Sequence, residues 1–350
     1  MRADPRPGPG GFAAPGAGGR GCRFRLGGGA AGIQRLEAEL VGQAFAPHRH
    51  DTYAVGVTLS GVQTFRYRGE QRHCLPGQWH ILHPDELHDG AAGTGDGFGY
   101  RIFYLDPALV QDALGGLPLP FVADPVIPAT GMPRVLGGFL ADIGEPLDEL
   151  EAVEVTTAIA DSLRAHASPA RGRPIGLDME AMRRIRSLLL DDPTTRHRAG
   201  DLEAASGLDR WTIARQFRAA YGTSPTRFRT MRRLDLARAL LLGGNPPAAA
   251  ATAAGFADQA HLTRMFKHAY GLTPATWAAA VHVTTSRTVP ATKGPSGDKC
   301  HDTAATIPAG VRLRQPASPT PMSPPPRLQT YSSQTAGHVK DRAGDTRPLR

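Results

Sequence analysis

The stretch "GFADQAHLTRMFKHAYGLTP", residues 255–274, reads as a tight turn followed by a short basic helix. A similar stretch, "GLDRWTIARQFRAAYGTSP" at residues 207–225, places its Arg, Phe, Tyr, Gly and Pro 49 residues earlier in the same register. Two copies are too few for a solenoid, which needs about three or more repeats to bury a continuous core. The duplication therefore predicts a pair of similar binding units.

Each copy has the proportions of a helix-turn-helix: a short helix (202–206 in the first copy), a turning glycine and a second helix (210–221). Ile213 and Phe217 lie four residues apart on the face expected to be buried, which leaves a basic face for the major groove of double-stranded DNA. The alternative is an ordinary helical bundle with a solvated basic face. Two copies in phase favour DNA binding.

The charge distribution supports this interpretation. The chain carries +8 overall, but residues 33–165 sum to −10 and residues 174–282 to +6. An acidic half followed by a basic half indicates that only the second half meets a polyanion.

The stretch "AAGFADQAHLTRMFKHAYGLTPATW", residues 253–277, resembles the DNA-binding domain of AraC/XylS-type transcription regulators. The resemblance implies two helix-turn-helix units, bridged by the long helix "TRFRTMRRLDLARALL", whose reading helices enter successive major grooves. It assigns the base-reading positions to Trp211, Ala214, Arg215, Gln259, Ala260, His261, Thr263 and Arg264. Flanking positions suited to phosphates are Arg210, Thr212, Arg218 and Lys267.

Residues 33–125 carry strand signals, with "YAVGVTLSG", "VQTFRYRG" and "GYRIFYLD" separated by Gly, Pro and Asp turns. Residues 133–165 change to the three- and four-residue period of packed amphipathic helices. Short strands of this kind favour a small barrel or sandwich. The expected fold is α+β, with a cupin-like N-terminal barrel and its following helices, then an all-α double helix-turn-helix.

The elements "PHRHD", "PG" and "HPDELHDG" look like the cupin-type barrel that serves AraC-like regulators as a ligand-binding domain. A small barrel encloses a pocket suited to one small molecule. We expect an unidentified effector to contact His48, His50, Tyr53 and His88.

The same histidines raise an enzyme alternative, because three imidazoles could hold a metal ion. "GQAFAPHRH", residues 42–50, fits the start of metal-binding cupins, but Ala54 stands where those carry a ligating Glu. Without that carboxylate we expect no metal, no cofactor and no catalytic residue. No GxSxG, Walker-type or HExxH motif occurs in the sequence. The chain is therefore predicted not to be an enzyme.

The flanks read differently from the two domains. Residues 1–32 are rich in Gly, Pro, Ala and Arg, and residues 283–350 are rich in Pro, Ser and Thr. Both compositions predict disorder. Residues 166–173 are predicted to form a linker. Three scattered cysteines and no long apolar stretch predict a cytoplasmic protein without a membrane partner.

The predicted function is that of a sequence-specific regulator whose promoter binding or activation responds to an effector in the domain at 33–165, with DNA bound at 174–282. The helices near 133–165 are expected to form a homodimer, and RNA polymerase is an expected partner. The alternatives are a metal-dependent cupin enzyme fused to a DNA-binding domain and an effector-independent DNA-binding protein.

Overall fold

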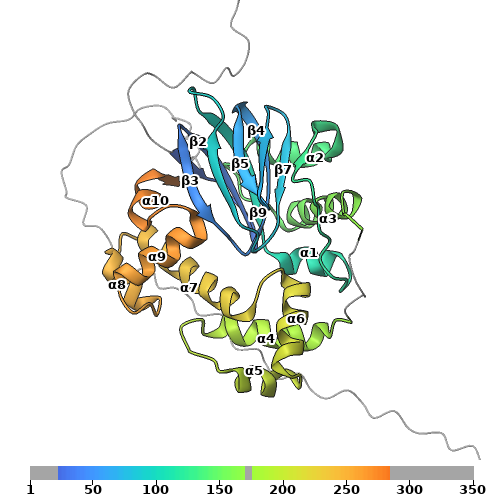
Figure 1. Cartoon of the computed structure of the whole chain (residues 1–350), viewed down its shortest axis with the longest axis vertical. Helices are drawn as coiled ribbons and strands as arrows, with labels where there is room; N and C mark the ends of the chain where they lie inside the picture. The colour runs from blue at the N-terminus through green and yellow to red at the C-terminus, as the bar shows by residue number, and fades with distance from the viewer. Residues whose placement is uncertain (1–22, 170–175, 284–350) are drawn as a thin grey trace, which may run out of the picture. The chain divides into compact units, whose positions relative to one another are not determined.

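The structure is a computed structural model that describes residues 23–169 and 176–283 (Figure 1). A β-rich N-terminal domain (residues 23–169) is followed by a helical C-terminal domain (residues 176–283) that ends in one short strand. This confirms the expected α+β fold class. Most of the two terminal segments for which we predicted disorder lies outside the described residues. None of the described helices is long and apolar enough to cross a membrane.

The N-terminal domain is built around two sheets, one of seven strands in the order β10-β7-β4-β9-β2-β1-β11 and one of four strands in the order β3-β8-β5-β6. The edge strand β11 of the larger sheet comes from the C-terminal domain. The larger sheet contains β1 (Arg23–Leu26), β2 (Ile33–Leu40), β4 (Tyr53–Gly61), β7 (Trp79–Leu82), β9 (Phe98–Leu105), β10 (Val126–Ile127) and β11 (Val281–Val283). The smaller sheet contains β3 (Gln43–His48), β5 (Gln63–Tyr67), β6 (Glu70–Cys74) and β8 (His88–Ala92). The three strands predicted from apolar runs are β4, β5 and β9.

Strand β4 divides its side chains between two cores, because successive residues of a strand face opposite sides of the sheet. Ala54 faces the core that the two sheets share. Tyr53 and Val55 face a second core, which includes side chains of three helices of the domain. These helices are α1 (Pro107–Ala113), α2 (Arg134–Ala141) and α3 (Glu149–Ala165). The helical period predicted for 133–165 is therefore confirmed.

Strand β1 corrects the predicted disorder of residues 1–32. Arg23–Leu26 pairs antiparallel with β2, and the side chains of Phe24 and Leu26 are buried in the shared core. The composition of residues 1–32 is dominated by Gly, Pro, Ala and Arg, and this bias masks a four-residue strand whose two apolar side chains alternate. Order therefore begins no later than Arg23.

The C-terminal domain repeats one unit twice. Its helices are α4 (Met179–Asp191), α5 (Ala199–Ser206), α6 (Arg210–Tyr221), α7 (Pro225–Leu242), α8 (Pro247–Ala253), α9 (Gln259–Tyr270) and α10 (Pro274–Ala280). Both α6 and α9 begin after an aspartate that accepts hydrogen bonds from backbone N–H groups, and both end at a glycine in the left-handed region. The helix that follows each glycine has a proline in its first turn. The duplication read from the sequence is thus a duplication of structure.

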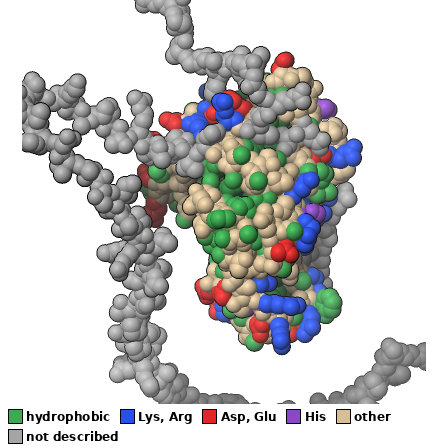
Figure 2. All heavy atoms as spheres, turned by 90° about the vertical axis from the view of Figure 1, so that its left-hand side faces the viewer, with side chains coloured by type: hydrophobic (Ala, Val, Ile, Leu, Met, Phe, Trp, Pro, Cys, Tyr) green, Lys and Arg blue, Asp and Glu red, His purple; other side chains and the backbone are tan. Residues whose placement is uncertain are grey.

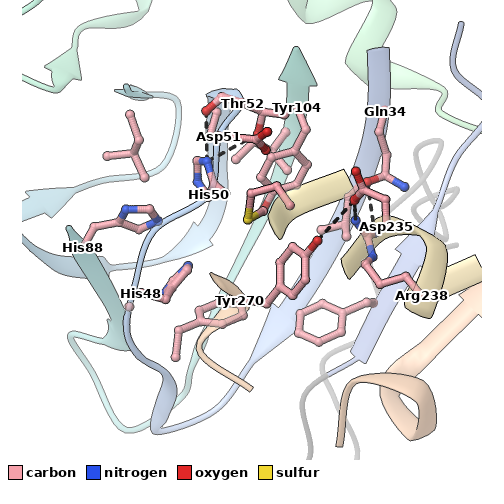
Figure 3. Close-up of a pocket in the computed structure, with 18 of the residues that line it drawn as sticks. Gln34, His48, His50, Asp51, Thr52, His88, Tyr104, Asp235, Arg238 and Tyr270 are labelled. Atoms are coloured by element: carbon pink, nitrogen blue, oxygen red, sulfur yellow. Dashed lines mark hydrogen bonds and ion pairs between the residues drawn. The ribbon is translucent and has the colours of Figure 1, made fainter. Parts of the chain in front are cut away.

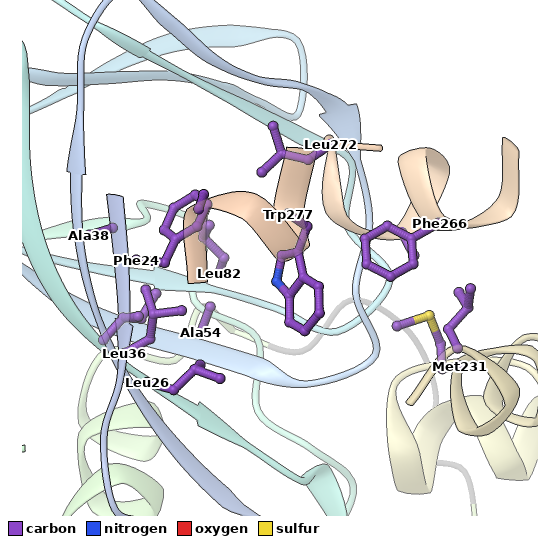
Figure 4. Packing of buried hydrophobic residues seen from close by; sticks show 14 of the residues in the cluster. Phe24, Leu26, Leu36, Ala38, Ala54, Leu82, Met231, Phe266, Leu272 and Trp277 are labelled. Atoms are coloured by element: carbon purple, nitrogen blue, oxygen red, sulfur yellow. The ribbon is translucent and has the colours of Figure 1, made fainter. Parts of the chain in front are cut away.

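The two domains share a hydrophobic core. Met231 of α7, Phe266 of α9 and Trp277 of α10 are buried in the same cluster as Phe24 and Leu36 of the larger sheet. Figure 4 shows the Trp277 indole between the strands and the ring of Phe266. After α10 the chain enters β11, which pairs in parallel with β1 in the register Phe24↔Val281. The C-terminal domain therefore packs directly on the sheets.

Candidate functional site

The first predicted reading helix, α6, presents a solvated face at its N-terminal end. Asp209 accepts hydrogen bonds from the N–H groups of Trp211 and Thr212 and so fixes the start of the helix. The Trp211 side chain is 71% exposed, and Ala214 and Arg215 are exposed on the same helix. The side chains of α6 that are buried against its supporting helices are Ile213, Phe217, Ala220 and Tyr221. The buried face matches the sequence prediction.

The second predicted reading helix, α9, is arranged in the same way. Gln259, Ala260 and Arg264 are exposed, whereas His261 and Thr263 are half-buried. The His261 ring packs edge-on against Phe256 with 5.4 Å between ring centroids, and its Nδ1 accepts a hydrogen bond from the backbone N–H of Ala257. His261 therefore already has contacts within its own turn. Figure 2 shows the side of the molecule with α8 to α10, where Lys and Arg gather along one edge and at the lower end.

The predicted phosphate contacts differ in their surroundings. Arg210 donates from Nε and Nη2 to the carboxylate of Glu203, at 2.9 and 3.1 Å. Thr212 accepts from Arg215 at 3.0 Å, and Arg218 pairs with Asp85 of the N-terminal domain at 3.4 Å. Lys267 is exposed in the last turn of α9. Three of these four side chains are thus engaged within the chain, and Arg218 connects the two domains.

A pocket of about 330 Å³ lies between the sheets and the C-terminal domain. Its wall on the sheet side includes His48, His50 and His88, and its wall on the helix side includes Met231 and Trp277. Other polar side chains that line it are Gln34, Asp51, Thr52, Gln63, His80, Asp89, Tyr100, Tyr104, Asp106, Arg232, Asp235, Arg238 and Tyr270. A ligand in this pocket would touch both domains.

Three of the four predicted effector contacts lie together at one end of the pocket (Figure 3). The ring centroids of His48 and His88 are 4.3 Å apart, those of His50 and His88 4.8 Å, and those of His48 and His50 6.2 Å. The structure places Tyr53 elsewhere: its ring packs edge-on against His83 at 5.2 Å, in the core beside α2 and α3. Thr52 and Ala54, one residue to each side of Tyr53, line the pocket instead.

Charged side chains from both domains meet at the pocket wall. Arg232 donates from Nη2 to Asp51 Oδ2 at 2.7 Å and lies 3.2 Å from Asp235. Arg238 contacts Gln34 Oε1 at 3.2 Å and Asp235 at 3.7 Å, and its guanidinium lies over the ring of Tyr270. Burial raises the pKa of Asp51 to about 6. The Arg232 guanidinium opposes this rise, and above about pH 6 the 2.7 Å contact joins two charged groups as an ion pair.

The histidines of the pocket are held as neutral imidazoles. Burial, together with the neighbouring imidazoles, lowers the pKa of His48 and of His50 well below its ordinary value. Burial also lowers the pKa of His88 to about 4 and that of His80 to about 3. Neutral imidazoles can accept hydrogen bonds or bind a metal ion. Ala54, buried in the wall, supplies no ligand, and no group of three or more His, Cys, Asp or Glu in residues 23–169 and 176–283 is arranged to hold a metal.

Comparisons with known proteins match both domains. Residues 30–168 match the model of the AraC-like ligand binding domain, and residues 202–280 match that of a helix-turn-helix domain. An uncharacterized HTH-type transcriptional regulator of Bacillus subtilis (strain 168), YbfI, is 24% identical over 225 residues, which cover 63% of this chain and 82% of that protein.

Solved structures of ToxT from Vibrio cholerae share the fold. The complex of the O395 protein with (E)-4-(8-methylnaphthalen-1-yl)but-3-enoic acid superposes with a TM-score of 0.52 at 15% identity and covers 71% of this chain and 99% of that one. Wild-type ToxT from strain SCE256 with bound unsaturated fatty acid has a TM-score of 0.52 at 14% identity, and the match covers 70% of this chain and 94% of that one. With its AraC-like ligand-binding domain followed by a duplicated helix-turn-helix, the chain belongs to the AraC family of transcriptional regulators.

Proposed function

We propose that this protein is a cytoplasmic, sequence-specific regulator of transcription whose DNA binding, or whose activation of a promoter, is set by a small molecule in the pocket between its domains. The observation that carries the proposal is the composition of the pocket wall. Strands β3 and β8 supply His48 and His88, the connection from β3 to β4 supplies His50, and α7 supplies Met231, Arg232, Asp235 and Arg238. A ligand there would contact the helix that joins the two helix-turn-helix units.

An effector changes DNA binding only if its affinity differs between two states of the protein. Side chains from both domains line this pocket, so any shift between the domains changes the ligand's contacts. The ion pairs Arg232–Asp51 and Arg227–Asp85, at 2.7 and 2.8 Å, oppose such a shift. A bound molecule that rearranged either pair would alter the position of α7 relative to the sheets. Such a shift would couple the effector to the reading helices α6 and α9 through α7, which joins them in the chain.

The proposed DNA contacts are the base-reading and phosphate positions named above. Arg215 and Arg264 hold equivalent places on α6 and α9, where an Arg can take O6 and N7 of a guanine together. Arg218 offers a link to regulation, because its side chain is suited to contact a DNA phosphate but is paired with Asp85 in this structure. Release of Arg218 from Asp85 would return one positive charge to the DNA-binding surface.

Two further partners belong to the proposal. Helix α3 carries Leu150 and Val153, which are 79% and 59% exposed. These two apolar side chains would be buried in the interface of a homodimer. RNA polymerase would be the partner of a promoter-bound activator. We propose no catalytic role, since the pocket carries Ala54 where a metal-binding cupin would place a glutamate.

The test uses the full chain. Preferred sites are selected from random duplex DNA, and affinity for the selected site is then measured against salt, with and without candidate effectors. A regulator of this kind binds one sequence class, loses affinity steeply as salt rises, and changes affinity when its effector is added. Binding without sequence preference, with no response to any molecule that occupies the pocket, would favour the effector-independent alternative. Turnover of a pocket ligand would favour the enzyme.

A further inference from the structure

The three clustered imidazoles, those of His48, His50 and His88, all use Nδ1 to contact a backbone carbonyl oxygen. Nδ1 of His48 lies 2.9 Å from the carbonyl oxygen of Ala46, Nδ1 of His50 lies 2.9 Å from that of Thr52, and Nδ1 of His88 lies 2.9 Å from that of Glu86. A carbonyl oxygen can only accept, so each Nδ1 carries the hydrogen and donates it. Nε2, at the far side of each ring, is left with its lone pair.

These lone pairs are concentrated in one place. The ring centroids lie 4.3 to 6.2 Å apart, and all three side chains are at least nine-tenths buried. Protonating one ring would supply one Nε2–H donor to a neighbouring imidazole, but burial lowers the pKa of each of the three. All three rings line the pocket, and an acceptor that a ligand shields from water without giving it a donor is costly, so the cluster favours a ligand that brings hydrogens.

The charged side chains that line the pocket do not favour the binding of an anion. Its lining carboxylates are Asp51, Asp89, Asp106 and Asp235, and its lining guanidiniums are those of Arg232 and Arg238. Arg232 is already paired with Asp51 at 2.7 Å, and Arg238 lies 3.7 Å from Asp235. A carboxylate ligand would have to compete with these aspartates for either guanidinium. In Figure 3 both Arg238 and Asp235 are set apart from the histidine cluster by Tyr270.

We infer that the effector presents N–H or O–H donors to His48, His50 and His88: it is an amine or an alcohol on an apolar body, and not a carboxylic acid. The inference rests on the proposed function, because it takes this pocket as the effector site. Apolar walls from Phe24, Leu36, Phe45, Leu82, Ile102 and Trp277 receive the body of the molecule. The expected class differs from the carboxylic acids bound in the ToxT structures.

The experiment compares four probes that share one ring and differ in one group: 2-phenylethylamine, 2-phenylethanol, phenylacetate and ethylbenzene. Binding to the full chain is measured by calorimetric titration. The amine or the alcohol is expected to bind at least about tenfold more tightly than phenylacetate and ethylbenzene, because a site of unpaired polar groups rejects analogues that leave it unpaired. Equal or tighter binding of phenylacetate overturns the inference, as does the failure of both donor probes to bind.

Variants locate the effect. In His88→Phe and His50→Phe one acceptor is lost while a planar ring is kept, and the advantage of the donor probe should shrink. His88→Gln, which keeps a side-chain acceptor, should recover part of it. His73→Phe is the matched control, because His73 is exposed on β6 and does not line the pocket. An equal loss in the control overturns the inference.

A second measurement does not depend on folded variants. Nitrogen chemical shifts of the wild-type imidazoles distinguish Nδ1–H from Nε2–H and report a donor approaching the bare nitrogen. The donor probe should move the Nε2 signals of the cluster, whereas a divalent ion held there before any probe is added overturns the inference. DNA binding is followed in the same preparations. If the protein does not bind DNA, the proposed function is contradicted. If DNA binding responds to a probe but phenylacetate binds more tightly than the amine and the alcohol, only the inferred class of ligand is contradicted.

Discussion

Arg232 of α7 and Asp51 of the N-terminal domain form an ion pair with 2.7 Å between Nη2 and Oδ2 and with only 3% of the Asp51 side chain exposed. The two residues lie 181 positions apart in the chain. Removing one partner leaves the other charge buried, whereas removing both leaves no isolated charge.

We therefore expect Asp51→Asn and Arg232→Met each to lower the free energy of unfolding by about 3–5 kcal/mol, and the double variant to cost clearly less than the sum. Urea titration of the full chain measures the cycle. The control pair is Arg183–Asp112, whose side chains are 58% and 61% exposed. Its removal should cost less than about 1 kcal/mol. Additive losses at Asp51 and Arg232 would show that the pair does not join the domains.

Strand β1 provides a second prediction. The Phe24 side chain is 2% exposed and packs on Phe45 with 5.9 Å between ring centroids. Phe24→Ala should lower the free energy of unfolding by about 3–5 kcal/mol, the cost of a cavity in a packed core. Arg23→Ala, at a side chain that is 73% exposed, should change it by less than about 0.5 kcal/mol. If both variants unfold at the same urea concentration as wild type, β1 is not part of the core.

The reading helices give a third prediction. Arg215→Ala should relax base preference at one position, by about 1–3 kcal/mol of discrimination. Arg264→Ala should do so roughly 10 base pairs away, if α6 and α9 enter successive grooves on one face. Lys267→Ala should weaken all sequences alike and lower the salt slope by about 1. Site selection with all three variants at one salt concentration decides the matter. Loss of preference at the same position in both Arg variants contradicts the two-groove assignment.

The fourth prediction concerns metal. With Ala54 in place of a carboxylate, the three imidazoles lack the negative ligand that would help to hold a divalent ion in a metal-binding cupin. Purified protein should carry far less than one metal ion per chain by elemental analysis, and a chelator should leave the affinity for DNA unchanged. Close to one ion per chain would revive the enzyme alternative.

Stability should fall in acid because of buried histidines. Burial lowers the pKa of His83 to about 3, and Nε2 of His83 accepts from the backbone N–H of Val122 at 3.0 Å, which requires its lone pair. His80, also with a pKa of about 3, behaves alike. In the unfolded chain these groups protonate near pH 6.5, so between about pH 6.5 and 3 the unfolded state binds more protons and stability is lost as pH falls.

Each such histidine contributes a slope of about 1.4 kcal/mol per pH unit once the pH is well below 6.5. Urea midpoints at pH 7, 6 and 5 should therefore decline, and the decline should be shallower in His83→Gln. His73→Gln, at an exposed residue, serves as the control and should keep the wild-type slope. A flat profile from pH 7 to 5 would contradict the buried, neutral state.

Local signals predicted the elements well. Asp178 caps α4, Pro225 stands at the start of α7, and Gly243 caps its end, and these residue types mark helix ends in a sequence. Helix α5 begins earlier than the range 202–206 expected from the sequence: it starts at Ala199, Arg198 holds the N-cap position, and Asp201 accepts a hydrogen bond from the Arg198 backbone N–H. Capping chemistry is local, so a sequence reveals it to within a few residues.

The site was harder to predict because half of it comes from distant parts of the chain. His48, His50 and His88 were found because they lie in "PHRHD" and "HPDELHDG", two elements that resemble those of a cupin-type barrel. Arg232 and Arg238 sit in a helix whose basic residues suggest only a solvated or DNA-facing surface, and nothing local shows that they turn toward the strands. Tyr53 does not line the pocket because side chains alternate along β4, so that its ring lies on the opposite side of the sheet from Ala54.

The parallel pairing of β11 with β1 has a practical consequence for domain exchange. A hybrid made by joining this N-terminal domain to another regulator's DNA-binding domain between residues 169 and 176 would lose β11, which follows α10. The outer backbone of β1 would then be an open sheet edge, able to recruit a strand from another molecule. Such hybrids should aggregate unless the graft keeps Val281–Val283, or a substitute strand, in register with Phe24.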